Sequence, residues 1–265
     1  MKFLISGSSG FIGSRFMELY GDAEVVDLHY KTLSDIKGLS MDVDYIFHLA
    51  AYGNMSYHDD DRQIIKSNID YLYNLLEATK DIDYKGFVNV SSSSVQLKHS
   101  TMYSATKRAG EEICKAFANK HDKPIVSVRP FSVYGPGDNK KHFIPVIVDK
   151  LENGGTLSIS RGTHDWIYVD DIVNAMWKLA HVAKEHKGEV FGLGTGVKTD
   201  NFDLVNKIKT LWSKPLNVSM VSRMRDYDTS GWYCRDKSIY KAIDWEPRSL
   251  VDGLVEYAKS LKTSI

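Results

Sequence analysis

A tyrosine and a lysine, Tyr103 and Lys107, stand four residues apart at the start of a run with apolar periodicity. On a helix this spacing places both side chains on one face, one turn apart. A free tyrosine has a pKa of about 10 and transfers protons poorly at neutral pH. An ammonium held within roughly 4 Å favours the phenolate by up to ~4 kcal/mol at an effective dielectric near 20. The pair could therefore act as a general acid/base, although the same pattern in isolation is more often a solvated surface pair.

A glycine-rich turn lies between the first apolar run, residues 2–6, and a segment with helical apolar spacing. Strand, glycine turn and helix is the order found in a loop that binds dinucleotide phosphates. Glycines let backbone N–H groups and the helix N-terminus approach a pyrophosphate closely. The turn alone is a weak indication. Its glycines and the first apolar residues of the helix are Gly7, Gly10, Phe11, Ile12 and Gly13.

The second apolar run ends in an acid, Asp27, which is followed by Leu28 and not by an arginine. An acid at the tip of the second strand accepts hydrogen bonds from the adenosine ribose hydroxyls and would repel a 2′-phosphate. The sequence therefore favours NAD over NADP; the alternative is an ordinary solvated acid after a strand. Further along, Asp35 and Ile36 could cover the adenine, and an acid that caps a turn is an equally good interpretation.

Two later strands end in residues suited to a ligand crevice. The run 45–51 reads as a buried strand that closes with Leu49-Ala50-Ala51, and small side chains there would let a cofactor lie across the strand. The run 87–90 leads directly into four serines, 91–94. Hydroxyls at the carboxyl end of a parallel strand point into the ligand crevice. A hydrophilic turn accounts for the serine run equally well.

Apolar residues at 65, 69, 72 and 76 recur at spacings of four, three and four, which predicts an amphipathic helix. Asn68 lies at the border of its buried face. An amide there either packs between helices or holds water near a reaction centre, and the periodicity favours packing. Strands alternate with helices up to Arg129-Pro130, which predicts an α/β fold with a doubly wound parallel sheet.

Beyond residue 143 this alternation loosens, and we expect a smaller lobe that covers the carboxyl edge of the sheet and holds the substrate. The expected division is residues 1–135 with returning segments at about 164–194 for the NAD-binding domain, and 136–163 with 195–265 for the substrate lobe. Four arginines in these later segments are candidate clamps for a substrate pyrophosphate, because guanidinium groups bind phosphate bidentately. Most could be solvated surface residues, and Arg225 is the preferred exception. They are Arg161, Arg223, Arg225 and Arg235.

Composition excludes several classes of partner. Lysine plus arginine equals aspartate plus glutamate at 34 each, so no global field draws the protein to nucleic acid or to a membrane surface. The opening apolar run is too short for a signal peptide, and no later run approaches a membrane span. Two cysteines without CxxC or histidine spacing give neither a disulfide framework nor a zinc site. We expect a soluble, cytoplasmic protein with no metal.

Taken in order and spacing, these motifs resemble the extended short-chain dehydrogenase/reductase family, in its branch of nucleotide-sugar epimerases and dehydratases. The resemblance spans nearly the whole chain. It rests on Gly7-x-x-Gly10-x-x-Gly13, Asp27, His48-Leu49-Ala50-Ala51, Asn68, the run 91–95, Tyr103-x-x-x-Lys107, Arg129-Pro130, the run 165–171 and Trp245-Glu246-Pro247.

The resemblance implies an NAD cofactor and a nucleotide-sugar substrate. Tyr103 would be the general acid/base on a sugar hydroxyl or carbonyl oxygen, and Lys107 would lower the Tyr103 pKa and hold the nicotinamide ribose. Ser92 would hydrogen-bond the same oxygen, with Ser91 or Ser93 in its place if the loop slips by one. The resemblance also places Asn68, Ser91, Arg129 and Pro130 near the cofactor and Ser92, Ser93 and Ser132 near the substrate. The family often dimerises through the helices at 65–76 and after 103, so we expect a homodimer.

Departures from the family pattern narrow the reaction. Family 4,6-dehydratases place an acid just after the catalytic hydroxyl, where this chain has Ser93 and Ser94. Without that acid, elimination of water lacks its second proton-transfer group. Ser132 stands where the family usually has Asn, and Gln96-Leu97 stands where it usually has Tyr-Gly. Both positions hold substrate in the family, so the sequence does not identify the sugar. The leading hypothesis is a 4-epimerase-like enzyme; the alternatives are a nucleotide-4-keto-sugar reductase or dehydrogenase and, less favoured, a 4,6-dehydratase or a non-catalytic NAD-binding protein.

Overall fold

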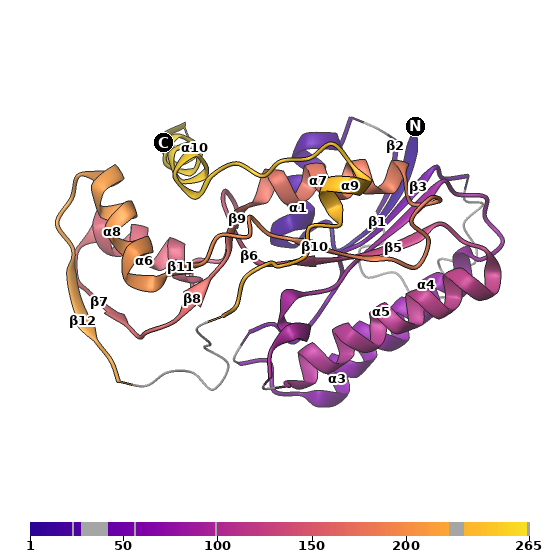
Figure 1. The fold of residues 1–265 in the computed structure, drawn as a ribbon, viewed down its shortest axis with the longest axis horizontal. Helices are drawn as coiled ribbons and strands as arrows, with labels where there is room; N and C mark the ends of the chain where they lie inside the picture. The colour runs from indigo at the N-terminus through magenta and orange to yellow at the C-terminus, as the bar shows by residue number, and fades with distance from the viewer. Residues whose placement is uncertain (23, 28–41, 56, 99, 223–230, 264–265) are drawn as a thin grey trace.

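A six-stranded parallel sheet forms the centre of the computed structural model, which describes residues 1–22, 24–27, 42–55, 57–98, 100–222 and 231–263 (Figure 1). The strand order is β10-β5-β4-β3-β1-β2. From β1 the chain adds β2 on one side and then crosses to β3 on the other, so the topological switch point lies between β1 and β3. The predicted doubly wound sheet is confirmed. The strands are β1 Lys2–Ser6, β2 Glu24–Asp27, β3 Tyr45–His48, β4 Gly86–Val90, β5 Ile125–Pro130 and β10 Val190–Leu193.

Helices cover both faces of this sheet (Figure 1). On one face lie α1, Phe11–Tyr20, and α7, Val169–His181. On the other lie α4, Tyr71–Thr79, and α5, Met102–His121. Because side chains alternate along a strand, Phe3 and Ile5 of β1 pack in the core under α1 and α7, and Leu4 packs under α4 and α5. Both faces are buried, which is why the strands read as continuous apolar runs.

The sequence predicts one regular α-helix over residues 65–76 with Ile65 on its buried face, and the structure corrects this prediction. The structure has α3, Asp61–Ile65, then a π-helical turn η1, Lys66–Asp70, and then α4. A π turn holds an extra residue and rotates the helix face. As a result Ile64 is buried, whereas Ile65, expected in the core, is 41% exposed. The rotation also brings Asn68 fully inside, at 3% exposure.

The later part of the chain builds a second apolar core between helices α6, α8 and α10, at the left of Figure 1. Their bounds are Phe143–Asn153, Asn201–Trp212 and Leu250–Thr263. The short strands here are β6 Ser132–Tyr134 paired with β9 Trp166–Tyr168, β7 Thr156–Ile159 with β12 Asn217–Met220, and β8 Thr163–His164 with β11 Thr199–Asp200. The short helix α9, Ile239–Ala242, follows. The exact domain boundaries stay a prediction.

The tail is attached to the N-terminal end of α7 by a buried acid. Asp171 accepts hydrogen bonds from Arg248 N and Nε, both at 3.0 Å, and its carbonyl accepts one from Trp245 Nε1 at 3.0 Å. Burial raises the pKa of Asp171, and the Arg248 charge opposes that rise. In the part of the chain described, no helix combines the length and the apolar character needed to traverse a bilayer.

Candidate active site

The glycine turn after β1 packs directly against the end of β3. Gly7 has φ +81°, and a Cβ there would lie 2.6 Å from the backbone nitrogen of Ala50. A Cβ on Gly13 would lie 2.0 Å from the Gly7 carbonyl oxygen, so only glycine fits either position. Gly10 is the N-cap of α1, and no side chain caps this helix end. The turn is therefore a backbone cradle at a helix N-terminus, which is the geometry that accepts a pyrophosphate.

The ends of β1, β2 and β3 lie side by side at the switch point. Asp27 ends β2 and its backbone pairs with Ile5 of β1. Leu49 N donates to Ser6 O at 2.9 Å, and Ala50 and Ala51 follow. These predicted cofactor contacts therefore gather at one edge of the sheet. The predicted contacts of Asp35, Ile36, Arg223 and Arg225 lie outside the described residues.

Tyr103 lies in the first turn of α5 and Lys107 in the next. The helix starts with a capping box in which Thr101 and Ser104 each accept from the other's backbone nitrogen, at 3.1 and 2.9 Å. Tyr103 is partly buried, and Lys107 is only 6% exposed. The solvated surface pair considered as the alternative is therefore wrong, because water hardly reaches the Lys107 side chain.

Burial controls the ionisation of this pair. It raises the pKa of Tyr103 to about 12, and a side-chain hydrogen bond with Ser92 opposes the rise. It lowers the pKa of Lys107 to about 8, and the neighbouring Cys114 and Glu111 oppose that fall. The direction for Tyr103 is opposite to the predicted one, because desolvation of the phenolate by burial is the largest cause acting on its pKa. Ser92, the predicted partner hydroxyl, is the side chain that opposes this rise, and its contact with the reacting oxygen stays a prediction.

A buried carboxylate, Glu111, lies one helical turn beyond Lys107 on α5 and binds two other side chains. Ser91 Oγ donates to Glu111 Oε1 at 2.5 Å, and Arg129 donates from Nε at 2.8 Å and from Nη2 at 2.6 Å. Arg129, predicted near the cofactor, thus binds Glu111, and Pro130 next to it ends β5. Sequence reasoning missed Glu111, although its position four residues after Lys107 puts it on the same helix face.

The side-chain amide of Asn68 holds a loop onto α5. Its Oδ1 accepts from Tyr52 N at 2.9 Å, and its Nδ2 donates to Tyr52 O at 2.8 Å and to Thr106 Oγ1 at 3.0 Å. Thr106 lies between Tyr103 and Lys107 on α5. This is the packing role that the periodicity favoured; a direct contact of Asn68 with cofactor stays a prediction.

The substrate candidates Ser93 and Ser132 meet side chains from distant segments. Ser93 Oγ accepts from Trp232 Nε1 at 3.1 Å, and Ser132 Oγ lies 3.1 Å from His164 Nδ1. The His164 and Trp232 rings are 5.2 Å apart between centroids. Sequence reasoning gave Trp232 no role, because a contact across 139 residues leaves no local signal. Arg161 is exposed.

Asp165 fixes the backbone around this cluster. Its fully buried carboxylate accepts hydrogen bonds from Thr195 N and Oγ1, at 2.9 and 2.6 Å, from Gly196 N at 2.9 Å and from Cys234 N at 3.0 Å. Four donors compensate the cost of burying the charge. The segment that carries Trp232 is thereby tied to the loop after β10.

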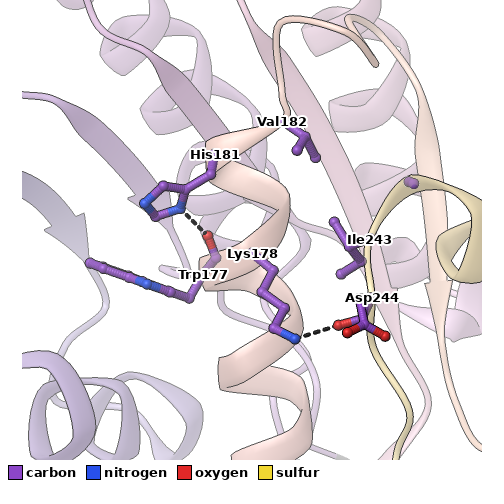
Figure 2. A pocket seen from close by; sticks show the side chains of 7 residues that line it. Trp177, Lys178, His181, Val182, Ile243 and Asp244 are labelled. Atoms are coloured by element: carbon purple, nitrogen blue, oxygen red, sulfur yellow. Dashed lines mark hydrogen bonds between the residues drawn. The ribbon is translucent and has the colours of Figure 1, made fainter.

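The pocket in Figure 2 lies elsewhere. It has a volume of about 530 Å³ and surrounds the C-terminal end of α7. The carbonyl of Ala180 there lies against Gly86, the first residue of β4, so this end faces the amino edge of the sheet, opposite the glycine turn. Its lining is Trp177, Lys178, His181, Val182, Ala242, Ile243 and Asp244. It takes no part in the candidate active site.

Comparison with known proteins gives matches along the whole chain. Residues 3–194 match the NAD dependent epimerase/dehydratase family. The low-salt glycan biosynthesis protein Agl12 of Haloferax volcanii is 27% identical over 96% of both chains, and the CDP-abequose synthase of Salmonella typhimurium is 27% identical over 97% of both. The structure of UDP-glucuronic acid 4-epimerase from Bacillus cereus, in complex with UDP-glucuronic acid and NAD, superposes with a TM-score of 0.87 at 23% identity and covers 100% of both chains. At that identity the likeness concerns the fold.

Proposed function

Because this chain belongs to the NAD dependent epimerase/dehydratase family and is an enzyme of the extended short-chain dehydrogenase/reductase type, we propose that it is an NAD-dependent nucleotide-sugar epimerase with a 4-epimerase-like reaction. The observation that carries the proposal is the placement of Tyr103 in the first turn of α5, one helical turn before the buried Lys107, with Ser92 as the side chain that opposes the rise in the Tyr103 pKa. A phenol, a hydroxyl and an ammonium in this arrangement suit proton transfer at a sugar oxygen.

The residues present fit NAD. Gly7 and Gly13 let the turn pack closely, because a Cβ at either position would clash with the backbone, and Gly10 leaves the N-terminus of α1 without a side chain where a pyrophosphate would bind. Asp27, at the end of β2, would bind the adenosine ribose, and Lys107 the nicotinamide ribose. When bound, NAD supplies a hydride acceptor and donor together with the positive charge of the oxidised nicotinamide.

The proton steps fall to side chains of this protein. Tyr103 Oη would take the proton from the sugar hydroxyl and return it to the same oxygen, while the Ser92 hydroxyl would hydrogen-bond that oxygen and hold it in place. The pKa of Tyr103, about 12 in the protein chain, has to fall for this task. A positive charge beside the phenolate lowers it, which is the contribution expected of Lys107 in its charged form.

The residues after Ser92 argue for an epimerase over a dehydratase. Ser93 is 2% exposed and its hydroxyl is bound to Trp232 Nε1 at 3.1 Å. Ser94 follows, so no carboxylate stands where dehydration would need a second acid/base. An epimerase oxidises and reduces the same sugar and so needs only the one proton-transfer centre at Tyr103.

Product analysis tests the reaction. The purified protein is offered UDP-, dTDP- and CDP-linked hexoses, and the products are separated by chromatography while absorbance at 340 nm follows NADH. An epimerase interconverts two sugars with no net NADH and keeps its NAD through purification. Stoichiometric consumption of NADH with a 4-keto sugar would instead identify a reductase, and loss of water from the sugar a dehydratase.

A further inference from the structure

The indole of Trp232 lies next to the pair of hydroxyls that define the proposed reaction centre. Trp232 Nε1 donates to Ser93 Oγ at 3.1 Å. Ser93 directly follows Ser92, the serine proposed to share the reacting oxygen with Tyr103. A residue 139 positions away in the chain is thus brought within one residue of the catalytic serine.

Several contacts from other elements hold Trp232 in this place. Its ring lies 5.2 Å from that of His164, and His164 Nδ1 lies 3.1 Å from Ser132 Oγ. Two residues further on, Cys234 N donates to the buried Asp165 at 3.0 Å. The indole is partly exposed, whereas its acceptor Ser93 is 2% exposed. The ring is therefore anchored at its polar edge, and part of it stays open to solvent.

The only polar group of an indole is its N–H, and here that group donates its hydrogen bond to Ser93. What remains is a rigid apolar ring beside the reacting hydroxyls. A hexopyranose presents C–H groups on its ring faces, and these pack well against an aromatic surface. Polar groups that fix orientation, together with an aromatic wall, are the usual composition of a small-molecule site.

We propose that Trp232 is a specificity-determining residue whose indole forms one wall of the sugar subsite. The hexose unit of the nucleotide sugar packs against the ring, and the bond to Ser93 sets the distance between this wall and the Ser92–Tyr103 pair. This assignment rests on the proposed function, because it presumes a nucleotide-sugar substrate. It assigns Trp232 to the sugar and not to the nucleotide, and that difference can be measured.

The test compares each nucleotide sugar with its own nucleotide. Calorimetric titration of NAD-loaded protein gives dissociation constants for UDP-glucose against UDP, dTDP-glucose against dTDP and CDP-glucose against CDP. In Trp232→Leu the preference for the sugar-bearing ligand should fall about tenfold, the size expected for a lost aromatic contact, with affinity for the nucleotide alone and for NAD unchanged. Unchanged NAD binding also shows that the variant folds.

Two milder variants separate the ring from its hydrogen bond. Trp232→Phe keeps an aromatic ring and loses the donor, and Ser93→Ala loses the acceptor. Each should reduce the sugar preference about threefold, and the double variant should be little worse than either, because both remove the same bond. Trp212→Phe, on α8 against the second apolar core, is the matched control and should behave as wild type.

The outcomes distinguish the two proposals. If wild-type protein prefers a sugar-bearing ligand and Trp232→Leu keeps that preference, the assignment of Trp232 is overturned while the proposed function stands. An equal loss for nucleotide and nucleotide sugar would also overturn it, since it would point to a role in closing the lobe. If wild-type protein shows no sugar preference in any of the three pairs, both proposals fail.

Discussion

The carboxylate of Glu111 is held by both nitrogens that Arg129 turns toward it, Nε at 2.8 Å and Nη2 at 2.6 Å, one helical turn beyond Lys107. The same carboxylate accepts a hydrogen bond from Ser91 at 2.5 Å. Helix α5, strand β5 and the end of β4 therefore meet at one buried charge. This joint fixes α5, and with it Tyr103 and Lys107, relative to the serine loop.

Glu111→Gln should destabilise the protein by about 3 kcal/mol, because it leaves a partly buried guanidinium without its counter-charge. Urea unfolding followed by circular dichroism measures the loss. Glu112→Gln, at the exposed neighbouring position on α5, is the matched control and should cost less than about 0.5 kcal/mol. Equal losses in the two variants would contradict the role assigned to the Glu111–Arg129 pair.

Lys107 should give the nucleotide-free protein a pH-dependent stability. Its pKa of about 8 in the folded protein lies below its ordinary value of 10.5, so between these values the unfolded chain holds more protons. Stability linked to Lys107 therefore rises with pH over this window. Lys107→Met has no such group, so the free energy of unfolding of wild type relative to this variant should increase by about 2 kcal/mol between pH 7.5 and 9.5. Urea unfolding at both pH values measures it.

The control for this pH dependence is Lys115→Met on the exposed side of α5. The difference between this variant and wild type should be the same at both pH values. A difference between Lys107→Met and wild type that also stays constant would show that Lys107 keeps an ordinary pKa in the folded protein.

Tyr103→Phe should reduce turnover by at least about 100-fold and leave NAD binding nearly intact, because it removes a proton-transfer group and keeps the ring. Steady-state rates with the converted nucleotide sugar and the NAD content of the purified protein are the two measurements. Tyr240→Phe, at a position that is 42% exposed, should retain wild-type rates. Activity of Tyr103→Phe equal to wild type would rule out the acid/base assignment.

Gly10→Ala should weaken NAD binding without unfolding the protein. Its new Cβ would lie 3.3 Å from the Gly7 carbonyl oxygen, which a small shift relieves, but the methyl group would enter the space proposed for the pyrophosphate. Gly13→Ala is the contrasting variant, since its Cβ would lie 2.0 Å from the same oxygen and should prevent folding. Fluorescence titration with NADH and thermal unfolding compare them. Wild-type affinity in Gly10→Ala would place the pyrophosphate elsewhere.

The homodimer expected from the sequence predicts the mass of the protein in solution and the effect of a charge on one helical surface. Ile65 and Tyr73 are 41% and 49% exposed on the outer helical layer, and Met102 at the start of α5 is 38% exposed. We expect light scattering to give about twice the chain mass of 30.0 kDa. Tyr73→Glu should shift the protein toward the monomer, because a charge at an apolar interface is costly. A monomeric mass for wild type would refute the dimer.

Much of the site could be predicted because its signals are local. The order of strand, glycine turn and helix depends on residues within a few positions of Gly7 and Gly10. The shared helix face of Tyr103 and Lys107 follows from a spacing of four. Asp27 was identified as the end of its strand from the apolar run before it. In each case the physical cause lies within one or two turns of the backbone, so the residue pattern is sufficient.

Only the tertiary structure decided which groups meet and how well water reaches them. The π turn places Ile65 outside the core. Glu111 on α5 binds Arg129 on β5, and Trp232 donates to Ser93, 139 residues earlier in the chain. The pKa of Tyr103 rises although a lysine stands four residues further along the same helix. Burial and long-range contacts depend on how distant segments pack together, and the local spacing of residues does not reveal that packing.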